Sequence, residues 1–166
     1  LSTPGPATLD GTLLTTPNLN PALWDQFPIR AALEIELRKH FPTVYVDYIG
    51  DGQAAALGEY AVRAGRVSWD RVPTVPRDES ELTSLFMAVV GTGLGGGVVR
   101  DGSPARGHEG RAGHLGHVFL PAEAFRYEHD RQLVVGNSKS TVESAVSLTG
   151  LTHQLQYRLS LDQWSA

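Results

Sequence analysis

Apolar and polar residues follow helical spacing in three stretches of this chain. Residues 28–40 place apolar side chains every three or four positions among charged ones, which predicts a helix whose first turn holds Pro28. Residues 51–64 predict a second helix, which Gly65 closes as a C′ glycine. Residues 140–143, Ser-Thr-Val-Glu, have the form of a capping box before a third helix that extends toward Leu159.

Short runs rich in β-branched or otherwise apolar residues lie between these helices and predict strands. The predicted strands are residues 12–16, 43–48, 84–90, 97–100 and 118–120. The stretch 68–81 contains Pro73 and Pro76 among mixed charges, which indicates a loop between two lobes. Helices that alternate with strands indicate an α/β protein with a mixed sheet and a cleft between lobes.

A glycine-rich stretch, GTGLGGG at residues 91–97, separates two of these apolar runs. Glycines reach positive φ and let an anion approach the backbone N–H groups, so phosphate is the obvious candidate ligand. The stretch does not end in Gly-Lys-Ser/Thr, and no helix pattern follows at once, so it is neither of the two commonest phosphate loops. A phosphate loop and a tight hairpin both remain open.

A second glycine motif follows shortly afterwards, at residues 107–117, with the pattern GxxGxAGxxGH. Together with residues 91–97, it resembles the ROK family, named for its repressors, open reading frames and sugar kinases. Three further segments agree in order and spacing: residues 4–6, residues 17–19 with Trp24, and residues 51–59. The resemblance extends from Ser2 to about Gly150.

The resemblance implies the actin-like ATPase (ribonuclease H-like) fold, an α/β fold with mixed sheets. On this alignment residues 1–67 are the remainder of the N-terminal sugar-kinase lobe, and 68–82 are the inter-lobe loop. Residues 83–166 start the C-terminal lobe, with the glycine-rich phosphate turn and the sugar-site motif. Family members carry an earlier phosphate turn and a longer helical tail, so we expect the fold to be incomplete at both ends of this sequence.

The implied function is ATP-dependent phosphorylation of a hexose or an N-acetylhexosamine, with ATP and Mg²⁺ as cofactors. Because the first phosphate turn and the adenosine-binding tail are not in the sequence, we expect little or no turnover from this chain alone. The alternative is a ROK-type transcriptional regulator, in which the sugar site serves as an effector pocket and a separate module binds DNA.

Asp51 matches the catalytic aspartate of the family, a base for the attacking sugar hydroxyl. An aspartate before a helix is most often an N-cap, which is the ordinary alternative. The position before it holds Gly50, where the family usually has a sugar-binding asparagine. One side-chain contact to the sugar is therefore expected to be lost.

The other implied site residues fall into two groups. The residues expected to bind sugar are Asn18, His114, His117 and Glu143, and those expected to bind ATP phosphates are Gly91, Thr92, Gly93 and Gly95. His114 stands where the family usually has a glutamate, which changes both charge and hydrogen-bond polarity. Ordinary roles stay open for three of these residues: a turn residue for Asn18, a satisfied histidine after a glycine turn for His117, and the capping-box glutamate for Glu143.

Many family members also hold a structural zinc with the histidine equivalent to His117 and a nearby cysteine cluster. Residues 133–140 match that cluster and contain no cysteine, so we expect no structural zinc. His108, His114 and His117, with Glu109, are close in sequence, but their spacing matches no standard zinc motif. His40, His129 and His153 are interpreted as surface groups.

Composition constrains the partners and the localisation of the protein less strongly than the motifs do. A net charge of −4 gives this segment no electrostatic reason to bind nucleic acid. No apolar run approaches the roughly 20 residues that span a bilayer, and no signal peptide is visible, so we expect a soluble, cytoplasmic protein without membrane contact. The expected partner is a small-molecule sugar. A homodimer is compatible with the resemblance, since the family commonly forms dimers.

Overall fold

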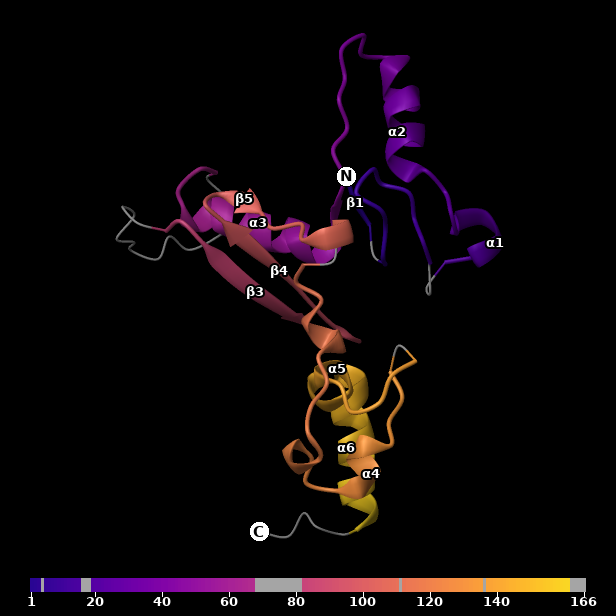
Figure 1. Cartoon of the computed structure of the whole chain (residues 1–166), viewed down its shortest axis with the longest axis vertical. Coiled ribbons are helices and arrows are strands. Elements are labelled where there is room, and N and C mark those ends of the chain that lie inside the picture. The colour runs from indigo at the N-terminus through magenta and orange to yellow at the C-terminus, as the bar shows by residue number, and fades with distance from the viewer. Residues whose placement is uncertain (4, 16–18, 68–81, 111, 136, 162–166) are drawn as a thin grey trace. The chain divides into compact units, whose positions relative to one another are not determined.

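The structure, a computed structural model, describes residues 1–3, 5–15, 19–67, 82–110, 112–135 and 137–161 (Figure 1). Helices and strands are mixed along the chain, which confirms the predicted α/β class. The chain divides into two compact units. Unit 1 is residues 1–87 with 97–112, and unit 2 is residues 88–96 with 113–166. The domain limits 1–67, 68–82 and 83–166 stay a prediction, and the predicted loop 68–81 lies outside the described residues.

The described part of unit 1 contains three helices and three short strands. They are β1 (Ser2–Thr3), α1 (Pro21–Trp24), α2 (Ile29–Arg38), β2 (Ile49–Gly50), α3 (Asp51–Arg63) and β5 (Ser103–Pro104), with a 3₁₀ turn, η1 (His108–Gly110). Strand β1 pairs with β2 in parallel. Two longer strands, β3 (Leu85–Val90) and β4 (Leu94–Arg100), contribute residues to both units, and the sheet order is β3-β4-β5.

Two predicted strands of unit 1 are shorter than expected. Within residues 12–15, Leu13 makes only an isolated bridge to Ala7, and its side chain is 1% exposed. Residues 43–48 form no ladder, and pairing begins at Ile49. Some apolar side chains of both runs enter the interior, where Leu13, Val46 and Tyr48 are buried, although neither run forms a long strand; Tyr45 points outward and is 79% exposed.

Helix α3 forms as predicted and builds the interior of unit 1. Its buried residues Gln53, Ala56 and Tyr60 recur at helical spacing, and Gly65 ends the helix at φ +66°. Ala56 and Tyr60 pack with Val99 of β4 in an apolar cluster. The strand approaches the helix so closely that a Cβ at Gly97 would lie 2.7 Å from Ala56 Cβ and 2.8 Å from the Gln53 Cα.

Unit 2 consists mainly of helices. They are η2 (Leu115–His117), η3 (Ala122–Ala124), α4 (Glu128–Arg131), α5 (Val142–Val146) and α6 (Leu148–Ser160), and α4, α5 and α6 pack together (Figure 1). The predicted strand 118–120 is reduced to a bridge between Phe119 and Thr141. In the part of the chain that the structure describes, no helix is long and apolar enough to cross a membrane.

The predicted third helix is divided at Ser147, which ends α5 and caps α6 by accepting from the Gly150 N–H at 3.1 Å. Its capping box lies one residue later than the sequence suggested. Thr141 is the N-cap and Ser144 its reciprocal partner, so the assignment to Ser140 and Glu143 is wrong. The Ser144 hydroxyl accepts from the Thr141 N–H and donates to the Thr141 carbonyl oxygen. The Glu143 side chain is therefore not needed as the capping partner.

Candidate functional site

Of the two interpretations of the glycine stretch, the structure has a hairpin: Gly91, Thr92 and Gly93 form the turn between β3 and β4, and Gly95, Gly96 and Gly97 belong to β4. At its turn, the Gly91 N–H donates to the Gly93 carbonyl oxygen at 2.9 Å. Two carbonyls of the turn accept from the start of α6: Gly91 O from the Leu148 N–H at 2.9 Å, and Thr92 O from the Thr149 hydroxyl at 2.8 Å. The turn is therefore held against the first turn of a helix within unit 2.

The Glu143 side chain joins α5 to this hairpin. Its Oε2 accepts from the Leu94 N–H at 2.6 Å. A Cβ at Gly93 would lie 2.5 Å from that oxygen, and a Cβ at Gly116 would lie 2.5 Å from the Leu94 carbonyl oxygen. Two glycines thus admit the carboxylate between the hairpin and η2. Since an ionised carboxylate offers about four lone-pair sites, one N–H bond leaves acceptor capacity for a ligand hydroxyl.

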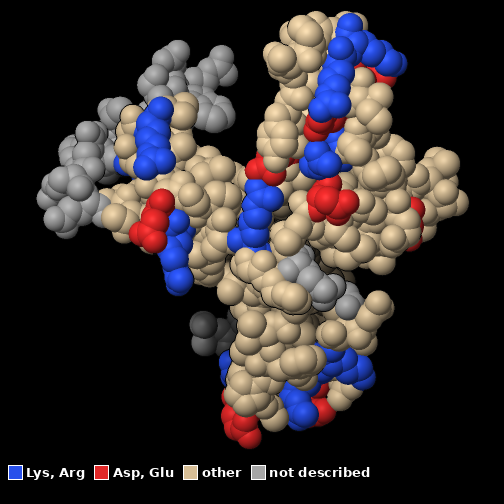
Figure 2. All heavy atoms as spheres, turned by 45° about the horizontal axis from the view of Figure 1, so that its top comes forward, with Lys and Arg blue, Asp and Glu red and all other residues tan. Residues whose placement is uncertain are grey.

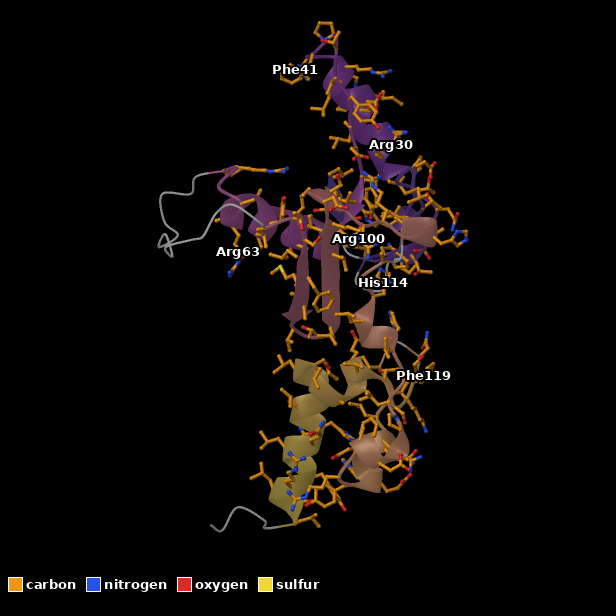
Figure 3. All side chains as sticks on the ribbon, turned by 60° about the vertical axis from the view of Figure 1, so that its left-hand side comes forward. Arg30, Phe41, Arg63, Arg100, His114 and Phe119 are labelled. Atoms are coloured by element: carbon orange, nitrogen blue, oxygen red, sulfur yellow. The ribbon has the colours of Figure 1, made fainter. Side chains whose placement is uncertain are left out.

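His114 and His117 lie at the two ends of η2, on either side of Gly116. Both side chains are exposed, and their ring centroids are 5.9 Å apart with the planes tilted by 53°. The His114 side chain is labelled in Figure 3. Neutral imidazole offers one donor and one acceptor, a combination suited to a polyol. All the residues predicted to bind sugar or ATP phosphates, except Asn18, belong to unit 2.

Asp51 is the first residue of α3, and the N-cap position is taken by Gly50. Its exposed carboxylate accepts from the Gly52 N–H at 2.8 Å, a favourable place for negative charge at a helix start. Because Asp51 lies in unit 1, its role as the base stays a prediction. Asn18, the remaining predicted sugar ligand, lies outside the described residues.

Sequence reasoning missed Gln53 as a positioning residue. This side chain is 4% exposed, and its amide donates to the carbonyl oxygens of Ala105 at 3.0 Å and Ala112 at 3.2 Å. It therefore holds both ends of the glycine-rich segment that leads to η2. The available signal was a polar residue on the otherwise apolar stripe of a helix.

Arg106 pairs with Asp47, whose backbone carbonyl accepts from the Leu1 amine. Desolvation, the largest single influence on the Asp47 pKa, raises it. Hydrogen bonds from Arg106 and the Tyr48 N–H, with the positive charges of Arg106 and the Leu1 amine, outweigh that effect and hold the pKa below 3.8. On the face drawn in Figure 2, basic side chains are interleaved with acidic ones.

The family model for the ROK family matches residues 1–163. The chain belongs to the ROK family. Among its curated relatives, the N-acetylmannosamine kinase of Shigella boydii is 33% identical over 110 residues, 66% of this chain and 31% of the relative. The ROK chain thus spans about a third of the length of the N-acetylmannosamine kinases that it matches.

Solved structures of the family share the fold. The ROK hexokinase of Thermus thermophilus superposes with a TM-score of 0.66 at 26% identity, over 96% of this chain and 44% of the hexokinase. A ROK family transcriptional regulator, homologous to the Escherichia coli MLC protein, gives a TM-score of 0.59 at 20% identity, over 96% of this chain and 33% of the regulator. The predicted actin-like ATPase fold of the ROK sugar kinases is confirmed by this likeness.

Proposed function

We propose that this chain is the sugar- and phosphate-binding part of a ROK sugar kinase, which phosphorylates a hexose or an N-acetylhexosamine. The observation that supports this most is the bond from the Leu94 N–H to the Glu143 carboxylate. It ties a sugar ligand of the family motif to the strand that begins at the phosphate turn. A kinase needs these two elements in fixed register, because phosphoryl transfer depends on positioning.

The residues present fit a nucleotide phosphate at the hairpin. A Cβ built at Gly91 or at Gly95 meets nothing within 4 Å, so the space beside the backbone there is open to an anion. When bound, ATP supplies the γ-phosphoryl group and Mg²⁺ neutralises the charge that develops on it. Thr92 and Gly93 would hold the phosphates with a hydroxyl and backbone N–H groups.

On the sugar side, His114, His117 and Glu143 would bind the ring hydroxyls, together with Asn18. Asp51 would accept the proton of the attacking hydroxyl. We place the protein in the cytoplasm, where ATP is supplied, and propose a homodimer that makes no nucleic-acid contact through this segment. His114, in place of the family's glutamate, would exchange an acceptor for a group that also donates, and so change which sugar is preferred.

Sugar binding and turnover test the proposal separately. Titration calorimetry with N-acetylmannosamine, glucose and mannose should give weak binding to one of them. We expect that binding to fall about 10-fold or more in Glu143→Gln, which loses a charged acceptor. The matched control is Glu59→Gln, an exposed glutamate of α3 that pairs with Arg63. Equal binding by both variants would contradict the sugar role of Glu143.

Turnover tests the base. In a coupled ADP-release assay of the whole kinase of which this chain is proposed to be a part, Asp51→Asn should lose about 10²-fold to 10⁴-fold in kcat and keep its sugar affinity, because a general base acts on the transition state. Asp101→Asn, at the exposed turn after β4, is the control. Unchanged turnover in Asp51→Asn would overturn the assignment.

The regulator is the second candidate, favoured by the replacement of a sugar-binding carboxylate with His114 and by the fold shared with a ROK regulator. It predicts sugar binding without ADP release at any substrate concentration. It also predicts that the affinity of the whole protein for its DNA changes when the sugar binds. ADP release that depends on Asp51 excludes it as the sole function.

A further inference from the structure

Three metal-ligating side chains come together in unit 2, away from the sugar and phosphate residues in sequence. His129 and Asp130 belong to α4, and His153 belongs to α6. One potential ligand atom from each lies within 4.8 Å of the other two. His129 and His153 were interpreted as surface groups, but the packing of α4 against α6 makes them neighbours.

The hydrogen bond of His153 selects its tautomer. Its Nε2 lies 3.1 Å from the His129 carbonyl oxygen, which can only accept, so Nε2 carries the proton. In the neutral ring, Nδ1 then holds the lone pair that a metal requires. A backbone carbonyl on the other ring nitrogen is a common way in which proteins orient a histidine ligand.

Asp130 supplies a buried negative charge. Its side chain is 3% exposed, and among the described residues the His129 ring and the Arg158 guanidinium reach it only at long range. The His129 Nδ1 is 3.5 Å away and the Arg158 guanidinium 3.9 Å away. A strong charge-assisted bond is about 2.7–2.9 Å, so these contacts compensate the buried carboxylate poorly. A divalent ion at the cluster would compensate it directly.

The His129 and His153 rings are neighbours but are stacked, so both must turn to bind one ion. The His129 ring stacks on the His153 ring at 4.0 Å and 9°, and on the Tyr157 ring at 4.1 Å and 8°. Ligands of a tetrahedral zinc are about 3.3 Å apart, from metal–ligand distances of about 2.0–2.1 Å. Each imidazole must turn out of the stack to aim its lone pair at the ion, and the 4.8 Å spacing must shorten.

We propose that His129, Asp130 and His153 bind a divalent transition metal ion, with Zn²⁺ as the preferred probe. Two imidazoles and one carboxylate form a ligand set used for zinc, with the fourth position left to water. The ion would fasten α4 to α6. It is distinct from the family's thiolate zinc, which the cysteine-free sequence cannot form.

Zinc binding to the untagged whole chain tests the proposal. Equilibrium dialysis followed by elemental analysis should find about one zinc per chain, and the affinity should fall at least about 10-fold in His153→Gln. Glutamine at this position keeps a donor for the His129 carbonyl, so the fold should survive. His40→Gln, in unit 1, is the matched control, and His117→Gln separates this cluster from the sugar site.

A spectroscopic reading shows where the ion binds. In proton NMR, zinc should move the His129 and His153 ring signals as the rings leave the stack, and His153→Gln should abolish that change. Co²⁺ should give visible ligand-field absorption that zinc displaces. Absence of zinc from the wild-type chain, or zinc retained in the double variant His129→Gln with His153→Gln, would overturn the proposal. Loss of binding in His117→Gln alone would do the same.

Discussion

The interiors of the two units differ in the type of side chain that they bury. Unit 1 buries apolar side chains, among them Leu13, Val46, Tyr48 and Val99. In unit 2, the most deeply buried side chains are polar: Asp130, Thr141, Ser144 and Ser147. Most large apolar residues of α6 are instead exposed: Leu148, Leu151, Leu155 and Leu159. Unit 1 is therefore stabilised by hydrophobic burial, and unit 2 by satisfied caps and hydrogen bonds.

This difference predicts which kind of substitution should destabilise each unit most. Loss of a buried methyl group removes transfer free energy and leaves a cavity, so unit 1 should respond to truncation. A capped helix end responds to loss of one oxygen, because a buried N–H is then unsatisfied. Regional hydrogen exchange reports the opening of each unit separately, and it can therefore test whether the two interiors differ in this way.

The largest effect is expected from Leu13→Ala. The fully buried leucine should cost about 2–5 kcal/mol of unfolding free energy when it is truncated. Leu23→Ala, at a side chain that is 67% exposed in α1, should cost less than about 0.5 kcal/mol. Urea unfolding measures both. Equal effects would mean that unit 1 has no apolar interior of the kind described.

Gly97→Ala should destabilise unit 1 by about 1–3 kcal/mol, because the added methyl group meets the backbone and side chains of α3. The matched variant is Gly95→Ala in the same strand, where a Cβ meets nothing within 4 Å. Exchange protection of α3 should fall only in the first variant. If Gly95→Ala were the more damaging, the close approach of β4 to α3 would be wrong.

In unit 2, Thr141→Ala should cost about 1–2 kcal/mol, since it removes the oxygen that accepts from the Ser144 N–H at 3.2 Å. Thr152→Ala, at an exposed position of α6, serves as the control and should be nearly neutral. Faster exchange confined to α5 and α6 is the expected signature. A loss of protection in unit 1 instead would show that the two interiors are not separable.

The smallest effect is expected on the pH dependence of the unfolding free energy, through Asp47. Because the Asp47 pKa is lowered in the folded chain, its pairing stabilises the fold above about pH 4, and that contribution disappears as pH falls through the lowered pKa. Both partners are partly exposed, so Asp47→Asn should cost less than about 1 kcal/mol at pH 7 and less still at pH 2. Urea midpoints at the two pH values measure it. A constant cost at both would assign the effect to packing.

Much of the fold could be predicted where periodicity is strong. Helices α2 and α3 lie within a residue or two of their predicted limits, because apolar spacing and a closing glycine are local signals. The strand at 43–48 was predicted from composition alone, which cannot distinguish a buried extended segment from a paired one. The break at Ser147 was missed because a serine inside an apolar pattern gives no sign that it caps a second helix.

The sequence motif predicts which residues belong to the candidate site, but it does not predict which groups those residues contact. The motif indicated Glu143, yet only the fold shows that its carboxylate reaches the Leu94 N–H, 49 residues away. Gln53 and the pair of Arg106 with Asp47 were missed for the same reason, since both depend on partners brought in from distant segments. His129 and His153 are 24 residues apart, and helix packing alone makes them adjacent.

The bond between Glu143 and Leu94 also has an evolutionary consequence. Gly93 and Gly116 leave room for that carboxylate only while both lack a side chain. A substitution at Gly116 would collide with the Leu94 carbonyl oxygen, a backbone atom that cannot turn away, whereas one at Gly93 would only displace the flexible end of Glu143. Descendants of this gene should therefore keep Gly116 longest and change residues 93 and 143 as a correlated pair.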